Sequence, residues 1–344
     1  MQAHFKKYIL NFKQPGGTSR GVLHTKETYF LFIEDDGKTG IGECGLFKGL
    51  SVDDRPDYEE KLQWVCTNIQ LGKEEILKQV SDLPSIQFGV EQAFLSLQSE
   101  NPFELFPSAF TQGTDAIPIN GLIWMGAPAF MKRQINEKLK TGFTTLKLKI
   151  GAIDFKAEME LLQSIRTEYS SQEIELRVDA NGAFDPNNAL EKLKRLSDFE
   201  LHSIEQPIKA GQWHEMAELC SKTPLPIALD EELIGIFSSE EKERLINSIQ
   251  PQYIILKPSL IGGFDGSSTW IEITNAHDVG WWITSALESN IGLNAIAQFT
   301  YSLGVNVPQG LGTGSLFTNN FDSPLMVEQG HLHYKPDLKW NVNL

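Results

Sequence analysis

Short apolar runs alternate with helical patterns along the chain from about residue 117 onwards. The runs lie at Ile117–Trp124, Thr145–Ile150, Glu175–Val178, Leu201–Ile204, Pro226–Leu229, Tyr253–Leu256, Trp281–Thr284 and Gly304–Val307. Segments with apolar residues at helical spacing separate them, at Asp154–Tyr169, Asn187–Leu196, Trp213–Cys220, Ser239–Ile249, Gly266–His277 and Gly292–Leu303. Strands that alternate with helices in this way predict an α/β fold of the (β/α)8 barrel type.

The first hundred residues follow a different pattern. Two strand-like runs, Thr28–Ile33 and Gly40–Glu43, flank the dipeptide Asp36-Gly37, which favours a tight hairpin turn because both positions tolerate positive φ. Residues Tyr58–Gln79 and Ile86–Gln98 then carry apolar residues at helical spacing. This part of the chain is therefore expected to be an α+β unit that precedes the barrel.

Charged residues stand at the ends of successive predicted strands. They are Lys149, Asp179, Glu205, Asp230 and Lys257, and their separations along the chain are 30, 26, 25 and 27 residues. Each separation is about one strand and one helix long. The carboxyl ends of barrel strands meet at a single rim, where the active sites of such barrels are built. We therefore expect these five side chains to face one mouth of the barrel.

The carboxylates of Asp179, Glu205 and Asp230 would repel one another in a partly desolvated mouth, so a cation is expected between them. Hard oxygen ligands in an open arrangement suit Mg²⁺, with Mn²⁺ as a possible substitute. Neither His nor Cys stands beside these acids in the sequence, which disfavours zinc. The alternative is that each acid merely caps the helix that follows it, which is less plausible for three acids in phase.

Lysines precede and follow the carboxylates along the chain. Lys149 and Lys257 would approach a bound carboxylate from opposite faces, an arrangement suited to removing the proton next to that carboxylate. A nearby cation would lower the pKa of such a lysine and make its neutral amine available as a base. Lys147, two residues before Lys149, projects to the same side of the strand. The alternative, a set of solvated surface lysines, does not account for two lysines within an apolar strand.

These segments together resemble the enolase superfamily and, within it, the muconate-lactonising-enzyme subgroup. The resemblance rests on LKLKI at Lys147–Lys149, VDANGAF at Asp179 and Asn181, IEQP at Glu205, LDEE at Asp230 and ILKPS at Lys257. It implies that Asp179, Glu205 and Asp230 bind the metal, that Lys149 is the general base, that Lys257 and Lys147 assist, and that Asn181 supports the metal or the substrate. It also implies a capping domain at 1–116, a barrel at 117–310, and a segment at 311–344 that returns to the capping domain.

The subgroup contains several reactions that share this ring of residues. Segments GGTSRG, SALESN and GLGTGSLFTNN resemble o-succinylbenzoate synthases of the Bacteroidetes type, which implies a Mg²⁺-dependent syn-dehydration in menaquinone biosynthesis. That resemblance makes Arg20, Ser285, Glu288, Gly310 and Gly312 candidate substrate contacts. Dipeptide epimerases carry an Asp-x-Asp element after the eighth strand, and no acid follows here until Asp322. The alternatives are an N-succinylamino acid racemase, a dipeptide epimerase and a catalytically silent barrel that acts as a binding protein.

Composition excludes some partners without identifying others. The chain of 344 residues has 45 Asp and Glu against 30 Lys and Arg, a net charge of −15, which disfavours nucleic acid and anionic membranes as partners. The N-terminal apolar run is too short for a secretory signal, and the three cysteines form neither a disulfide pattern nor a zinc pattern. We therefore expect a cytoplasmic protein with a small carboxylate substrate, of an oligomeric state that the sequence does not define.

Overall fold

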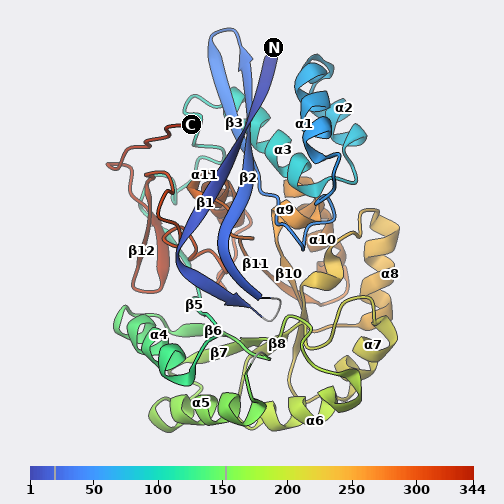
Figure 1. The fold of residues 1–344 in the computed structure, drawn as a ribbon, viewed down its shortest axis with the longest axis vertical. Coiled ribbons are helices and arrows are strands. Elements are labelled where there is room, and N and C mark those ends of the chain that lie inside the picture. Colours follow the sequence, from blue (N-terminus) through green and yellow to red (C-terminus); the bar gives the residue numbers. More distant parts are fainter. Residues whose placement is uncertain (19–20, 152) are drawn as a thin grey trace.

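The computed structural model describes residues 1–18, 21–151 and 153–344 and consists of a capping domain above a barrel (Figure 1). The capping domain begins with an antiparallel sheet of β1 (Gln2–Thr18), β2 (Gly21–Asp35) and β3 (Lys38–Cys44). Its helices are α1 (Tyr58–Thr67), η1 (Ile69–Leu71), α2 (Lys73–Gln79) and α3 (Pro84–Gln98). Asp36 and Gly37 join β2 to β3 with φ values of 47° and 76°, so the structure contains the predicted tight hairpin.

Glycines let strand β3 lie directly against helix α3. A Cβ atom on Gly42 would collide with the backbone of Gly89, and one on Gly40 would collide with the backbone of Ala93. Gly89 in turn leaves room for the side chain of Cys44. The close approach buries Leu31, Ile33, Ile86 and their neighbours in a core of their own, separate from the core of the barrel.

The barrel contains a parallel sheet in the order β11-β10-β9-β8-β7-β6-β5. Its strands are β5 (Gly121–Ile123), β6 (Thr145–Lys149), β7 (Glu175–Asp179), β8 (Ser203–Glu205), β9 (Ile227–Leu229), β10 (Tyr253–Leu256) and β11 (Gly280–Ile283). The helices that connect and flank them are α4 (Pro128–Lys140), α5 (Phe155–Glu168), α6 (Pro186–Ser197), α7 (Trp213–Lys222), η2 (Glu231–Leu233), α8 (Ser239–Ile249), α9 (Pro258–Ile261), α10 (Gly263–Ala276) and α11 (Asn290–Ser302). This architecture confirms the predicted fold class.

Local sequence signals explain where several of these helices begin. The side chain of Asp154 accepts hydrogen bonds from the backbone N–H groups of Lys156 and Ala157 at the start of α5. Ser238 and Glu241 form a reciprocal capping box at the start of α8. These caps satisfy N–H groups that have no partner within the helix, so each helix starts at a defined residue next to its strand.

The predicted first and eighth strands of the barrel need correction. Ile117–Trp124 is divided between β4 (Ala116–Pro118), which pairs with the C-terminal hairpin, and β5, which belongs to the barrel. Gly304–Val307 is not a strand. The barrel instead closes through single bridges at Gln309, opposite Ile119, and at Gly310, opposite Thr284. The apolar run ends at Val307, and backbone hydrogen bonds of Gln309 and Gly310 make the closure.

The C-terminal segment runs back beside the N-terminal sheet. Its hairpin of β12 (Leu325–Glu328) and β13 (His331–Tyr334) pairs with β4. Before this hairpin, Phe317 bridges Phe12 of β1, and the Asn319 side chain bonds to the backbone of Ile9 and Asn11. These contacts join residues that are about three hundred positions apart in the sequence, as expected if the segment completes the capping domain.

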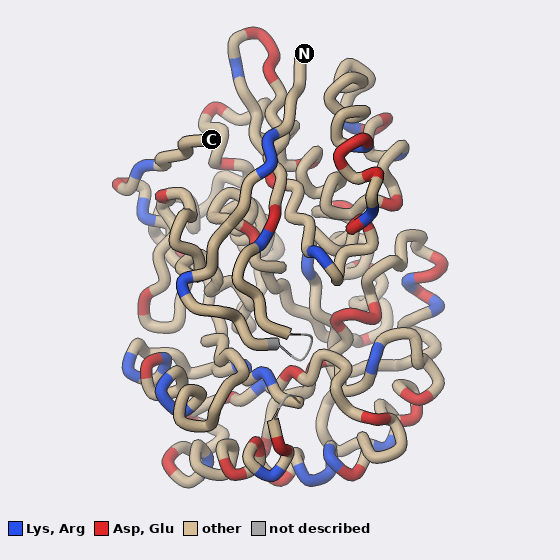
Figure 2. The backbone as a smooth tube through the Cα atoms, in the orientation of Figure 1, with Lys and Arg blue, Asp and Glu red and all other residues tan. Residues whose placement is uncertain are grey.

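Charged residues and cysteines occupy different parts of the structure. Acidic and basic residues are interspersed along the outer helices of the barrel (Figure 2). Cys44, Cys66 and Cys220 are all buried with free thiols. Across residues 1–18, 21–151 and 153–344, no helix combines the length and the apolar character that crossing a membrane requires.

The glycine contact between β3 and α3 leads to a testable expectation for stability. Gly42→Ala should lower the free energy of unfolding by roughly 1–3 kcal/mol, because the added methyl group overlaps the backbone of α3. Thr39→Ala, at an exposed position of the same strand, should change it by less than about 1 kcal/mol. Urea unfolding measures both variants, and equal effects would contradict the proposed close packing.

Candidate active site

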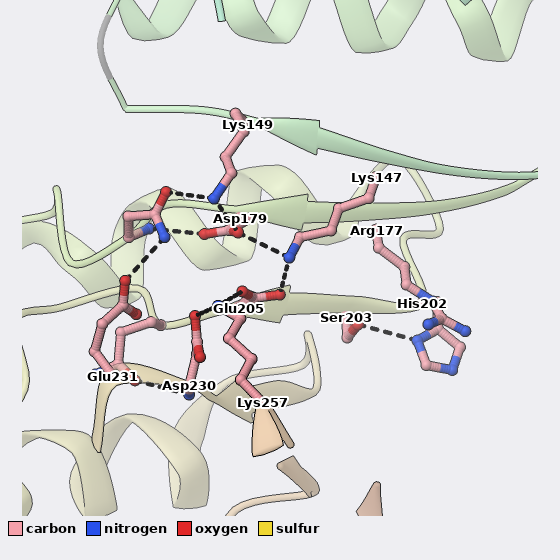
Figure 3. Close-up of polar contacts among 12 residues, drawn as sticks. Lys147, Lys149, Arg177, Asp179, His202, Ser203, Glu205, Asp230, Glu231 and Lys257 are labelled. Carbon is pink, nitrogen blue, oxygen red and sulfur yellow. Dashed lines mark hydrogen bonds and ion pairs between the residues drawn. The ribbon is translucent and has the colours of Figure 1, made fainter. Parts of the chain in front are cut away.

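Strand register places charged side chains from neighbouring strands next to one another. Lys149 of β6 pairs with Asp179 of β7, which pairs on its other side with Glu205 of β8. Asp230 and Lys257 directly follow β9 and β10. The structure thus brings together all five strand-end residues that the sequence indicated (Figure 3).

The lysines contact the carboxylates in this site. The Lys149 Nζ lies 2.7 Å from Asp179 Oδ2, and the Lys147 Nζ lies 2.9 Å from the same oxygen, so both lysines project to the same side of β6. Lys147 also forms an ion pair with Glu205. Lys257 forms an ion pair with Asp230 and lies 3.9 Å from Glu205 Oε1. The site is therefore a buried cluster in which each ammonium group faces at least one carboxylate.

Burial and neighbouring charge move the pKa values of the carboxylates in different directions. Burial and the adjacent Asp179 carboxylate raise the pKa of Glu205 well above its ordinary value. Burial alone would raise the pKa of Asp179, but Lys147 and Lys149 outweigh it and hold that pKa well below its usual range. The pKa of Asp230 is likewise lowered because Lys257 offsets burial. The cluster thus opposes ionisation of all three carboxylates together, as expected for close like charges.

The carboxylates have the reverse effect on two of the lysines. Burial by itself would lower the pKa of Lys147, but Asp179 and Glu205 outweigh it and raise that pKa. Asp230 and Glu205 raise the pKa of Lys257 in the same way. A divalent cation held by these carboxylates would add positive charge and act in the opposite direction on both lysines.

Asn181 connects the lysine side of the site to η2, which follows β9. Its backbone has a φ of 44°, in the left-handed region that asparagine tolerates better than most residues. The Asn181 Oδ1 accepts a hydrogen bond from Lys149 at 2.7 Å, and its Nδ2 donates to Glu231 Oε1 at 3.0 Å. Its backbone N–H donates to Asp179 Oδ1. Asn181 therefore orients both Lys149 and Asp179.

The donor set of the site is suited to a hard cation. Asp179, Glu205 and Asp230 are nearly inaccessible to solvent, and the carboxylate oxygens of Glu205 face the ammonium groups of Lys147 and Lys257. In the part of the chain that the structure describes, no three Asp, Glu, His or Cys side chains already surround one point as metal ligands do. Lysine ammonium groups provide the positive charge between these carboxylates. Carboxylate oxygens are ligands that suit Mg²⁺, so Asp179, Glu205 and Asp230 are residues that could hold it.

A pocket opens beside the lysines. Its polar wall includes the three lysines together with Asn120, Thr284, Ser285 and Thr313. Its apolar wall comes from both domains, because Leu23, Phe47 and Leu50 belong to the capping domain, whereas Leu122, Trp124 and Leu287 belong to the barrel. The last part of β1 reaches this wall, where Gly16 lies against the Trp124 ring. The pocket therefore combines apolar surface with a few convergent polar groups, as binding sites for small molecules do.

The expected substrate contacts occupy different places. Ser285, Gly310 and Gly312 line the pocket, and the Ser285 hydroxyl lies 2.6 Å from that of Thr313. Glu288 is fully buried behind this wall, where it accepts hydrogen bonds from Ser259 and from the backbone of Ala286. The structure does not bring it to the pocket. Arg20 lies outside the described residues.

The sequence interpretation overlooked most of the pocket wall. Asn120, Leu122 and Trp124 are spaced two residues apart around β5, and this spacing places alternate side chains on one face of a strand. That periodicity was a usable signal. Phe47 and Leu50 lie in the loop after β3, and nothing in the sequence pattern placed that loop over the barrel mouth.

Comparison with known proteins identifies the family. The family model described as enolase C-terminal domain-like matches residues 131–337. The o-succinylbenzoate synthase of Desulfotalea psychrophila is 47% identical to this chain, and the match covers 96% of this chain and 98% of that protein.

Solved structures agree with this match. The crystal structure of MenC from Desulfotalea psychrophila LSv54 has a TM-score of 0.86 and 43% identity, covering 97% of this chain and 99% of that one. A dipeptide epimerase from Enterococcus faecalis V583, complexed with Mg and the dipeptide L-Leu-L-Tyr, has a TM-score of 0.82 and 20% identity over 96% of each chain, which shows a shared fold. The chain therefore belongs to the enolase superfamily, within its muconate-lactonising-enzyme subgroup.

Proposed function

We propose that this protein is a cytoplasmic o-succinylbenzoate synthase of menaquinone biosynthesis. Its substrate is then 2-succinyl-6-hydroxy-2,4-cyclohexadiene-1-carboxylate. The observation that carries the proposal is the 47% identity, over nearly the whole of both chains, to a protein of that name. The site geometry supports it, since lysines flank buried carboxylates beside a pocket with an apolar wall.

Asp179, Glu205 and Asp230 would hold the metal ion, and enzymes of this superfamily depend on Mg²⁺ in general. When bound, Mg²⁺ supplies positive charge that stabilises the negative charge developing on the substrate carboxylate as the neighbouring proton is removed. Mn²⁺ prefers similar oxygen ligands and is a possible substitute. Asn181 would support the metal site by orienting Asp179 through its backbone N–H.

Lys149 would act as the base and then as the acid. Its neutral Nζ accepts the proton from C1 of the substrate, and the C1–H electron pair forms the new ring double bond as the C6–O bond breaks. The same Nζ returns that proton to the departing hydroxyl, which leaves as water. One substrate molecule thus gives one o-succinylbenzoate and one water, and the aromatic ring of the product supplies driving force. Asn181 orients the Lys149 Nζ for both transfers.

Lys257 and Lys147 would act mainly through their charge. Lys257 lies across the carboxylates from Lys149, so it would face the opposite side of the substrate ring, where a cation can stabilise developing charge. Lys147 lies deeper, against Asp179 and Glu205, and would offset the charge of the substrate carboxylate. Neither residue has to transfer a proton in a syn-dehydration.

The pocket wall would bind the remainder of the substrate. Its apolar side chains suit the cyclohexadiene ring and limit the access of water. Ser285, Gly310 and Gly312 line the wall near the closure of the barrel, where hydroxyl and backbone N–H groups could receive the succinyl carboxylate.

N-succinylamino acid racemase is the second candidate activity. The observation in its favour is that lysines lie on both sides of the carboxylate cluster, as a reaction that protonates either face requires. In that reaction Lys257 would have to donate and accept a proton, whereas dehydration needs only Lys149.

Replacement of Lys149 tests its role as the base. Lys149→Ala and Lys149→Arg should each lower kcat by roughly a thousandfold or more, because an alanine lacks the base and a guanidinium stays protonated. Lys156→Ala, at a lysine whose side chain is 81% exposed, is the matched control and should leave turnover unchanged. The measurement is product absorbance, with circular dichroism to verify folding. Near-normal turnover by either Lys149 variant would remove Lys149 from its role.

Removal of the metal tests the proposed ligand set. Turnover should fall to background after treatment with EDTA and should return on addition of Mg²⁺, because three buried carboxylates depend on a cation in the proposed mechanism. Asp230→Asn should weaken Mg²⁺ binding in calorimetry and raise the Mg²⁺ concentration needed for half-maximal rate. A rate that persists without metal would contradict the proposed mechanism, and Mn²⁺ in place of Mg²⁺ tests the substitution.

Isotope exchange separates the two candidate activities. In deuterium oxide, dehydration of the cyclohexadiene substrate should be much faster than deuterium incorporation at the α-carbon of N-succinylamino acids. Nuclear magnetic resonance measures both rates on the same enzyme. Exchange with inversion at a rate that rivals dehydration would make racemisation a principal activity of this protein.

A further inference from the structure

The segment from Ser285 to Ser289, between β11 and α11, forms one wall of the pocket. Ser285, Ala286 and Leu287 all line it. Leu287 has a φ of 63°, in the left-handed region that a leucine rarely adopts. A bulky residue keeps such a conformation only when its surroundings enforce it. The contacts that enforce it therefore determine the shape of this wall.

Glu43 of the capping domain provides the main contacts. It lies in β3, is fully buried, and faces the start of α11 across the domain boundary. Its Oε1 accepts a hydrogen bond from the Ser289 backbone N–H at 3.0 Å, and its Oε2 accepts from the Ser289 hydroxyl at 2.5 Å and the Gly292 N–H at 2.9 Å. Thr28 of β2 also donates to Oε1, which fixes the carboxylate in place. One capping-domain side chain thus binds three donors at the end of the pocket segment.

Two further buried charges surround this contact. Glu288 folds back onto its own segment and accepts the Ala286 N–H at 2.7 Å. Lys26 of β2 is 6% exposed, and among the described residues its Nζ has no hydrogen-bond partner. Burial lowers the pKa of Lys26, while Glu288 and Glu43 act against that effect by attraction. Leu287 also packs with Leu10 of the capping sheet and Phe317 of the C-terminal segment, so its side chain contacts two other parts of the chain.

We propose that Glu43 is a positioning residue for substrate binding: by fixing Ser289 and Gly292 it holds Leu287 in its left-handed conformation against the pocket. This inference rests on the proposed function for its kinetic test. Glu43 touches neither the lysines nor the strand-end carboxylates in any contact described above, so it acts through the pocket wall. The capping domain then shapes the site without supplying a reacting group.

Glu91 supplies a matched control within the same domain. It lies in α3, is 3% exposed, and accepts the backbone N–H groups of Phe264 at 2.5 Å and Asp265 at 3.0 Å, at the start of α10. Like Glu43, it is a buried capping-domain carboxylate that binds the first turn of a barrel helix. The Glu43 partner Ser289 lies two residues after Leu287, which lines the pocket, whereas the Glu91 partners lie in α10, where no residue lines it. Comparison of the two separates positioning of the pocket wall from general attachment of the domains.

The test uses Glu43→Gln and Glu91→Gln in the full chain, because each amide keeps the shape of the side chain but turns two hydrogens toward donors. Glu43→Gln should raise KM for the cyclohexadiene substrate by roughly tenfold while kcat stays within about twofold, since the lost fit affects bound substrate and transition state alike. Glu91→Gln should leave KM unchanged. Leu287→Ala should raise KM as Glu43→Gln does, and it serves if Glu43→Gln does not fold.

Hydrogen exchange followed by mass spectrometry gives a readout independent of activity. Glu43→Gln should speed exchange in peptides that cover Ser289 and Gly292, whereas Glu91→Gln should speed it only around Phe264 and Asp265. Wild-type KM in Glu43→Gln or in Leu287→Ala would overturn the inference, as would an equal rise in KM in Glu91→Gln. Failure of the wild-type protein to dehydrate the substrate would instead contradict the proposed function. In that case the exchange measurement still tests the positioning role, because unchanged exchange at Ser289 in Glu43→Gln would overturn it.

Discussion

Charges buried in the mouth of the barrel must be compensated, and the arrangement of the site follows from this requirement. The parallel register of β6, β7 and β8 places Lys149, Asp179 and Glu205 in adjacent positions, where a carboxylate without a partner would be very costly. In the structure, ammonium groups provide this compensation. A divalent cation would do so in the proposed active enzyme. The same buried carboxylates can therefore serve both folding and catalysis.

The capping domain contributes to the site through shape. Phe47 and Leu50 form part of the apolar wall. Glu43 accepts hydrogen bonds at the start of α11, next to Leu287 with its left-handed backbone. Glu91 makes a comparable contact with α10. Backbone N–H groups at the start of a helix attract a carboxylate, so two buried acids on one domain can fix its orientation on the other. This division of roles fits a family in which one ring of residues performs several reactions, because pocket walls can change while the ring stays the same.

The charged ring could be predicted because its cause is local. Each of these residues follows an apolar run at a strand end, and their spacing equals one strand and helix unit, so a barrel forces them together. The hairpin at Asp36-Gly37 was predictable for a similar reason, since its turn type depends on two adjacent residues. The split of Ile117–Trp124 and the closure at Gln309 and Gly310 were not, because pairing with distant strands, rather than local hydrophobicity, decides which residues join a sheet.

The sequence by itself therefore determined the barrel class, the hairpin and the identity of the residues in the charged ring, because periodicity and strand-end position carry that information. Only the tertiary structure decided which residues surround the substrate pocket. Leu23, Phe47 and Leu287 meet there although they are far apart in the chain, and Glu288, which the sequence suggested as a substrate contact, lies behind the wall. The packing of the capping domain on the barrel produces these contacts, and no local pattern records that packing.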